Sequence, residues 1–576
     1  MHRKAIAAVR RNIQKIVPHR ETFILYAFAM FVGVAGGLAA VFFESIIRIN
    51  EYFFREVVGG LLVLQLGAYG KVFIPAIGGL IVGTVTYYLA KETAGHGIPE
   101  VMEAVLHRKG EIRFRVPVVK ALVSAITLGS GGSSGREGPI AQIGAGVGSG
   151  IGKLFKMGTE EKKLLATCGL AAGIAGSFDA PLGGALFAVE VLHCRMGRET
   201  LIPVILSSVL GASIGEQLLG KGHAFTSPPF VFQDINSLFG YMLLGAICGI
   251  AGVLWVKAYY GIEHGFEKLK LPTPYKAAFG GFLVGAIGLW FPQVMGVGYK
   301  TVEAVLFGGF SIGLLAALVF MKILATGFTL GSGGSGGVLS PTIFIGTMVG
   351  GAMGLAFVNT FNIGVENPMV FALVGMGAFF TAVNKAPLTG IVFASEVSGN
   401  YQLLIPLMFS CALSYFIFSI FSEDNIYTKR LRLKGLKPPS EKLDILTTIK
   451  VGDVMNKQVD SVAGIRLAGE LRRAVRDKKV RARAYYPVTE KGNVTGIVRL
   501  RDIERVTYRD KEKRVHDIMQ VEFDVIYPDN TVREALDLMH QKHLPFIPVV
   551  ERLGEKKLIG AFTHHDIIHA YQNAME

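Results

Sequence analysis

The sequence has 576 residues and a formal net charge of +15; 51% of its residues are hydrophobic and only 18% are charged. A typical soluble domain carries about 25% charged residues. Charged residues are scarce mainly in residues 22–421, which are long apolar stretches interrupted by glycine. A wholly soluble protein is therefore excluded. Lys and Arg residues cluster before the first apolar stretch and after the last one, as expected beside anionic lipid. Because this position accounts for the positive charge, we predict no nucleic-acid partner.

The first apolar stretch covers residues 22–48, with Glu44 as its one internal charge. It exceeds the roughly 20 residues that span a bilayer and is too long for the apolar part of a signal peptide, so it predicts a retained transmembrane helix. The flanking basic residues place residues 1–21 and the tail of the chain in the cytoplasm. We therefore expect a multi-pass protein of the bacterial inner (cell) membrane with both termini cytoplasmic.

Two blocks of the sequence occur twice in the same order. Residues 127–133 read Thr-Leu-Gly-Ser-Gly-Gly-Ser, and residues 329–335 repeat them without change. Residues 180–191 match residues 386–397 at eight of twelve positions. Because the two offsets are nearly equal, the repeats indicate a duplicated membrane domain.

The duplication gives two related halves, at about residues 22–220 and 239–421, and such repeats are typical of secondary transporters. Transporter substrate sites lie near the midplane, on broken helices whose N-termini face an anion. Irregular backbone at membrane depth has to lie within protein or line a cavity. The two glycine-rich runs are therefore candidates for the permeation path; the alternative is that they only let helices pack closely.

The strongest candidate for chemistry is the segment 135–139, which reads Gly-Arg-Glu-Gly-Pro. Proline favours the first turn of a helix, and the free amides and dipole of a helix N-terminus attract an anion. A Glu137 carboxylate at that spot could take the place of the anion and leave it when protonated, which would make a pH-sensitive gate. The alternative is that Arg136 and Glu137 pair with other buried charges for structural reasons.

Three short motifs and one tyrosine stand in a fixed order: residues 95–99 (Gly-His-Gly-Ile-Pro), 135–139, 337–341 (Gly-Val-Leu-Ser-Pro) and Tyr427. In these motifs residues 22–435 resemble the CLC family of chloride channels and chloride/proton exchangers. The resemblance implies a homodimer in the lipid bilayer, with one pore per subunit, an all-α membrane domain of two inverted-topology repeats, and Glu137 as the outer gate. The implied anion-binding residues all lie in these motifs and are His96, Gly97, Ile98, Arg136, Glu137, Gly138, Val338, Leu339 and Tyr427.

Two departures from the family pattern affect the mechanism. His96 stands where the family most often has serine, so either its ring donates to the central anion or, as we favour slightly, it points away and backbone amides hold the ion. Val191 stands where exchangers typically have the inner glutamate of the proton pathway, and valine cannot relay a proton. The neighbouring Glu190 recurs as Glu396 in the second half, which indicates a structural role such as capping a helix end.

The tail contains a second repeat, with units at residues 449–508 and 514–573. Each unit mixes short β-type runs with a helical pattern and resembles a CBS domain, so we predict a cytoplasmic α/β CBS-domain pair. The adenine-nucleotide motif of such pairs, Gly-x-x-Thr-x-x-Asp, is kept with Thr563 and Asp566, whereas the first unit keeps only Asp502. We expect one site for ATP, ADP or AMP; the alternative is a purely structural dimerisation module.

These features predict a chloride (small-anion) channel that is gated by protonation or displacement of Glu137 and modulated by nucleotide at the CBS pair. Val191 favours passive flow. The alternative is a chloride/proton antiporter whose proton route does not need a glutamate at position 191. The sequence contains no metal-ligand cluster and no nucleophile with a partnering base, so we expect no required cofactor, no metal and no enzymatic activity.

Overall fold

The computed structural model describes residues 20–194, 196–220, 237–361, 367–436, 438, 445–447, 449–477, 483–506, 512–552 and 556–573. Most of the predicted N-terminal segment, residues 1–19, lies outside the described residues. The chain divides into two compact units, Met1–Pro439 and Ser440–Glu576.

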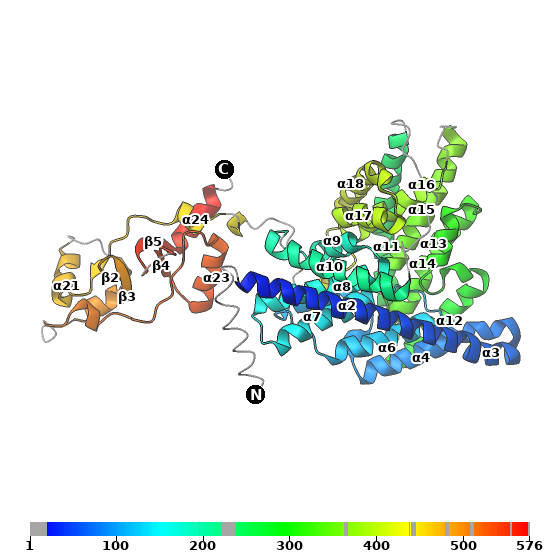
Figure 1. The fold of residues 1–576 in the computed structure, drawn as a ribbon, viewed down its shortest axis with the longest axis horizontal. Coiled ribbons are helices and arrows are strands. Elements are labelled where there is room, and N and C mark those ends of the chain that lie inside the picture. The colour runs from blue at the N-terminus through cyan, green and yellow to red at the C-terminus, as the bar shows by residue number, and fades with distance from the viewer. Residues whose placement is uncertain are drawn as a thin grey trace. The chain divides into compact units, whose positions relative to one another are not determined.

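The first half of the membrane unit is a series of helices coloured blue to cyan in Figure 1. The long helix α2 (Arg20–Tyr52) opens it, and most of the helices that follow are shorter. These helices are α3 (Gly59–Leu66), α4 (Phe73–Tyr88), α5 (Ile98–His107), α6 (Arg115–Gly129), α7 (Glu137–Leu154), α8 (Thr159–Phe178), α9 (Pro181–Val191) and α10 (Arg198–Leu219).

The second half, green to yellow in Figure 1, again opens with a long helix that is followed by shorter ones. Its helices are α11 (Ser237–Lys268), α12 (Thr273–Trp290), α13 (Tyr299–Leu306), α14 (Ile312–Gly331), α15 (Leu339–Phe361), α16 (Val370–Asn384), α17 (Pro387–Ser398) and α18 (Leu404–Phe421). The short helix α19 (Thr428–Leu433) follows α18.

The helix boundaries follow the sequence repeat. Helix α7 begins at Glu137 and α15 begins 202 residues later, at Leu339. Helix α9 begins at Pro181 and α17 begins 206 residues later, at Pro387. Equivalent helices of the two halves also meet, because α4 packs against α12 and α9 against α17. The duplicated, all-helical membrane domain predicted from the sequence is confirmed.

Glycines let helices within each half touch along their backbones. A Cβ atom on Gly144 of α7 would lie 2.1 Å from the carbonyl oxygen of Gly169 in α8. At the equivalent place in the second half, a Cβ on Gly346 would lie 2.6 Å from the carbonyl oxygen of Gly375. Any side chain at these positions would push the helices apart. Small residues at helix contacts are the usual means of close packing in membranes.

Six helical segments in the described part of the chain are long and apolar enough to cross a membrane, among them Thr22–Tyr88, Leu238–Lys268 and Tyr401–Phe421. Large apolar side chains on these segments are exposed at the outside of the unit; Phe42, for example, is 65% exposed. In a lipid bilayer such side chains face acyl chains rather than water. The prediction of a multi-pass membrane protein is confirmed.

The second unit contains two small α/β modules (Figure 1). The first has a three-stranded sheet in the order β1-β2-β3, with β1 parallel to β2 and β2 antiparallel to β3; the second has an antiparallel pair, β4-β5. Each sheet packs its apolar face on helices, around Leu471 in one module and Met539 in the other. The elements are α20 (Val451–Val454), β1 (Val462–Ala463), α21 (Ala468–Arg476), β2 (Tyr485–Glu490), β3 (Asn493–Arg499), α22 (Leu500–Glu504), α23 (Val532–Lys542), β4 (Phe546–Val550), β5 (Leu558–Thr563) and α24 (His564–Asn573).

Candidate anion pathway

The three motif segments meet in the interior of the membrane unit. Gly95 donates its N–H to the carbonyl oxygen of Gly334 at 2.9 Å. Gly135 and Gly337 exchange backbone hydrogen bonds of 2.7 and 2.6 Å. These bridges join the segments that lead into α5, α7 and α15, so three helix N-termini come together at one place. The predicted grouping of the three motifs is what the backbone contacts show.

A glycine is required where two of these segments cross. A Cβ on Gly138 would lie 2.2 Å from the carbonyl oxygen of His96. Gly97, with φ of 82°, also adopts a backbone conformation that favours glycine. The glycine-rich motifs here therefore bring backbone amides close together, rather than only bringing whole helices into contact.

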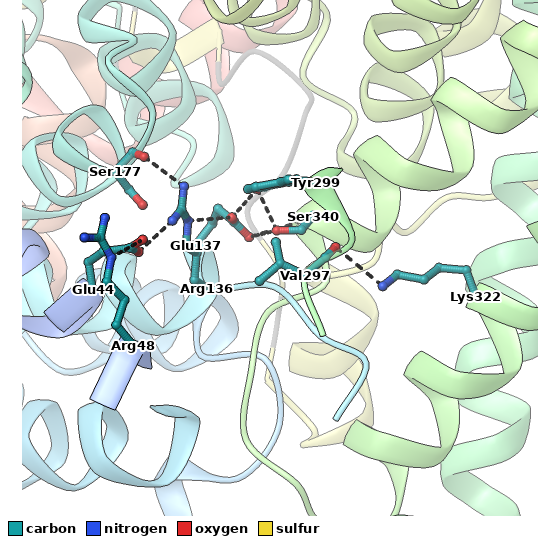
Figure 2. A network of polar contacts seen from close by, with 9 residues as sticks. All are labelled: Glu44, Arg48, Arg136, Glu137, Ser177, Val297, Tyr299, Lys322 and Ser340. Atoms are coloured by element: carbon teal, nitrogen blue, oxygen red, sulfur yellow. Dashed lines mark hydrogen bonds and ion pairs between the residues drawn. The ribbon is translucent and has the colours of Figure 1, made fainter. Parts of the chain in front are cut away.

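The carboxylate of Glu137, the first residue of α7, reaches across to the N-terminus of α15. Its Oε2 accepts hydrogen bonds from the Ser340 hydroxyl and from the Ser340 N–H, the latter at 3.2 Å. Its Oε1 accepts one from the Tyr299 hydroxyl, as Figure 2 shows. The side chain is fully buried. A negative charge thus lies where the free amides and dipole of α15 favour an anion.

The side chain of Arg136 turns the other way, toward α2 and α8. Its Nη1 lies 2.6 Å from Oε2 of Glu44, and its Nη2 donates to the carbonyl oxygen of Ser177 at 3.1 Å (Figure 2). Its guanidinium also lies over the ring of Tyr299, 5.3 Å from the centroid. Its Nε is 3.8 Å from the nearer oxygen of Glu137. The structural pairing considered for Arg136 is thus present, with Glu44 as its partner.

The remaining predicted residues lie at the same helix starts or just inside them. Gly97 caps α5 and Ile98 is its first residue, while Leu339 is the first residue of α15 and follows Val338. The ring of His96 is buried, with its centroid 5.9 Å from that of Tyr427.

Sequence reasoning missed two neighbours of Glu137, Tyr299 and Ser340. Ser340 lies inside a motif that was recognised only for its backbone. Tyr299 had a weaker signal: residues 296–299 read Gly-Val-Gly-Tyr, which repeats the glycine spacing of residues 95–98 at an offset of 201. The repeat could therefore have placed Tyr299 at the start of a helix that faces the pathway.

Two buried lysines, also missed, support the glycine-rich segments from behind. Lys120 Nζ donates to the carbonyl oxygens of Thr93 at 3.0 Å and Gly95 at 2.7 Å. Lys322, which lies 202 residues later, donates to the carbonyl oxygens of Val294 and Gly296, both at 2.9 Å. Charged residues inside a membrane domain are costly and mark function by default. The two lysines place one amine in each half beside the segment that leads into α5 or α13.

Val191 is buried among apolar side chains, and its neighbour Glu190 acts at a helix end. Glu190 accepts hydrogen bonds from the N–H groups of Thr389 at 2.7 Å and Leu388 at 3.1 Å, at the start of α17. Its counterpart Glu396 accepts from the N–H groups of residues 182 and 183, at 3.0 and 2.6 Å, at the start of α9. The predicted capping role of these two glutamates is confirmed, and each half caps a helix of the other.

In the second unit, the two modules carry different copies of the nucleotide motif. Asp566 accepts hydrogen bonds from the N–H and the hydroxyl of Thr563, both at 2.7 Å, at the start of α24. In the first module, Arg499 Nε donates to Asp502 Oδ2 at 2.6 Å. The carboxylate of Asp502 is thus paired with an arginine, whereas that of Asp566 is paired with a neutral threonine. The difference predicts that the two motifs contribute unequally to a ligand site.

A membrane domain of two related halves, whose broken helices direct their N-termini at a shared place holding one carboxylate, defines an anion-transport protein. Comparison with known families agrees. Residues 78–419 match the family described as voltage gated chloride channel, and residues 451–508 and 515–573 each match the CBS domain. The chain belongs to the CLC family of anion-transport proteins and carries two CBS domains.

Several curated relatives cover the membrane unit. The chain is 31% identical over 413 residues to a putative chloride channel protein ClcB-like of Ralstonia nicotianae, with 71% of this chain and 96% of the relative covered. It is also 31% identical over 423 residues to the H(+)/Cl(-) exchange transporter ClcA of Vibrio parahaemolyticus, with 71% and 89% covered. Proteins named as channels and proteins named as exchangers are thus equally similar.

Solved structures show the same fold. The structure of a slow cyanobacterial Cl-/H+ antiporter matches with a TM-score of 0.65 and 24% identity, covering 71% of this chain and 97% of that one. A eukaryotic CLC transporter matches with a TM-score of 0.62 and 20% identity, covering 95% of this chain and 98% of that one. The second match extends the likeness to the part of the chain that follows the membrane unit.

Proposed function

We propose that this protein is a chloride/proton antiporter in which Glu137 carries the proton and competes with chloride for one place. The observation that carries the proposal is the position of the Glu137 carboxylate at the N-terminus of α15, where it accepts hydrogen bonds from Ser340 and Tyr299. An ionised carboxylate and an anion cannot share the free amides at the N-terminus of α15, so protonation of Glu137 frees the Ser340 N–H for chloride. Because the carboxylate and chloride occupy this place in turn, the side chain can carry a proton one way while chloride moves the other way.

Relatives named as exchange transporters support this proposal, and the position of the Glu137 carboxylate favours it over the channel that Val191 indicated. Val191 bears on the route of the proton from the cytoplasm and not on its acceptor, because Glu137 is present. A proton can reach Glu137 through water or other side chains. The channel remains the second candidate, since other relatives are named as chloride channels.

Reconstituted protein tests the choice. Liposomes loaded with chloride and placed in a chloride-poor medium drive outward chloride flow, and a pH electrode records the protons that enter against their own gradient. An antiporter moves protons uphill, whereas a channel moves none.

We further propose that the CBS pair binds one adenine nucleotide through Thr563 and Asp566, because Asp502 is already paired with Arg499. Isothermal titration of the full-length protein with ATP, ADP and AMP tests this. No heat with any of the three would leave the structural dimerisation module.

The proposed assembly rests on the family resemblance, and the proposed location rests on the basic residues that flank the membrane unit. We propose a homodimer with one pathway per subunit, placed in a bacterial inner membrane with both termini in the cytoplasm. Cross-linking in membranes checks the dimer, and protease access to the tail in inside-out vesicles checks the topology.

A further inference from the structure

Tyr259, on the second half's long helix α11, lies beside His96 although it belongs to none of the sequence motifs. The two ring centroids are 5.7 Å apart, with an angle of 68° between the ring planes. Trp255, one helical turn earlier, packs on Tyr259 at the same centroid distance. Tyr259 is fully buried, as is Tyr427, which approaches His96 at 5.9 Å. His96 therefore lies next to two buried phenol rings.

Three polar atoms of this group have no hydrogen-bond partner in the described part of the chain. Within the residues that the structure describes, the Nδ1 of His96 and the hydroxyls of Tyr259 and Tyr427 are buried and have no hydrogen-bond partner. The adjacent Tyr260 behaves as a buried tyrosine usually does, since its hydroxyl donates to the carbonyl oxygen of Ile426 at 2.6 Å. Leaving buried polar groups unpaired is costly. Three such atoms on neighbouring rings point to one shared polar ligand.

The surrounding charges indicate the sign of that ligand. The charged groups whose fields act on His96 are Lys120, Arg430 and Lys434, and all three are basic. The carboxylates that act on Tyr259 are Glu263 and Glu100, and both are paired. Arg430 lies 2.8 Å from the first, and Lys434 lies 3.2 Å from the second. Lys434 also lies 3.0 Å from Glu103, so each of these carboxylates is paired with a basic group. Two hydroxyl donors among neutralised carboxylates suit an anion.

We propose that Tyr259 is a specificity-determining residue of the central anion site, and that its hydroxyl donates to the ion together with His96 and Tyr427. The proposal rests on the proposed function only in taking chloride as the ligand, and it does not depend on proton coupling. A small halide holds its charge at high density and so gains more from hydroxyl donors than a large, weakly hydrated anion does. Tyr259 therefore favours chloride over anions such as thiocyanate.

The test compares Tyr259→Phe with Tyr260→Phe in the full-length protein. Each change removes one buried hydroxyl and keeps the ring. Calorimetric titration with potassium chloride and potassium thiocyanate gives the two affinities. We expect Tyr259→Phe to weaken chloride binding on the order of tenfold, as for loss of a hydrogen bond to a charged group, and to weaken thiocyanate binding less. Tyr260→Phe should leave the ratio of the two affinities unchanged.

Incorporation of 3-fluorotyrosine at position 259 provides a second test that keeps the hydroxyl and makes it a stronger donor. Chloride affinity should then rise. Unchanged chloride affinity in both the Phe and the fluorotyrosine variants would overturn the proposal, as would an equal loss for both anions in Tyr259→Phe. If wild-type protein moves no protons uphill while Tyr259→Phe still weakens chloride binding, the antiport proposal fails and this one stands.

Discussion

Replacing Tyr299 by phenylalanine removes one of the donors that hold the Glu137 carboxylate across the pathway. The Tyr299 ring packs on Phe178, with centroids 5.9 Å apart, and under the guanidinium of Arg136. A phenylalanine keeps both ring contacts. The change therefore tests the hydroxyl and its hydrogen bond to Glu137, with little disturbance of packing.

The size of the effect follows from the nature of the bond. A hydrogen bond to a charged group contributes about 1.5–3 kcal/mol, whereas Glu137 keeps its two bonds from Ser340. The conformation in which the Glu137 carboxylate blocks the pathway should become less stable by about that amount. Chloride should then displace it at concentrations lower by a factor on the order of ten or more.

Chloride efflux from proteoliposomes at neutral and alkaline pH measures this shift. Flux through Tyr299→Phe should exceed that of the wild type, and the difference should vanish at acid pH. In a Glu137→Ala background, Tyr299→Phe should add nothing, because the two residues act as a pair. Equal flux from wild type and Tyr299→Phe at alkaline pH, or additive effects in the double variant, would refute the reasoning.

Three further predictions concern groups away from the gate. Glu190→Gln should lower the free energy of unfolding by about 1–2 kcal/mol through its helix cap and leave the ratio of chloride to protons unchanged; a changed ratio would place Glu190 on the proton route. Lys322→Met removes a positive charge and its bonds to backbone carbonyl oxygens, so it should lower thermal stability and chloride affinity, and Lys120→Met should do the same; wild-type values in both would contradict the role of the lysines. Arg499→Thr should release Asp502 and tighten adenine-nucleotide binding in calorimetry, whereas weaker binding would show that the arginine itself holds the ligand.

Much of the fold could be predicted because the sequence repeats itself. The paired runs at residues 127–133 and 329–335 fix the equivalent helix starts at Glu137 and Leu339. The same symmetry correctly indicated that Glu190 is structural. A glutamate present at the same place in both halves is expected to have the same role in both, here the capping of a helix.

The remaining parts of the site could not be read from motifs, for a physical reason. Tyr259 reaches the pathway from α11, a helix of the second half that contacts His96 of the first half only after the halves pack together. Nothing in the sequence neighbourhood of Tyr259 distinguishes a pathway tyrosine from one in the core. Lys322 could have been recognised from the repeat, because it lies 202 residues after Lys120. That separation becomes informative only once the structure shows that each lysine binds backbone carbonyl oxygens.

Uphill proton movement driven by a chloride gradient is the measurement that tests the central claim most directly. Wild-type protein in chloride-loaded liposomes should acidify the interior as chloride leaves, and Glu137→Ala should carry chloride without moving protons. Chloride flow through the wild type with no proton movement would contradict the account and leave a passive anion channel.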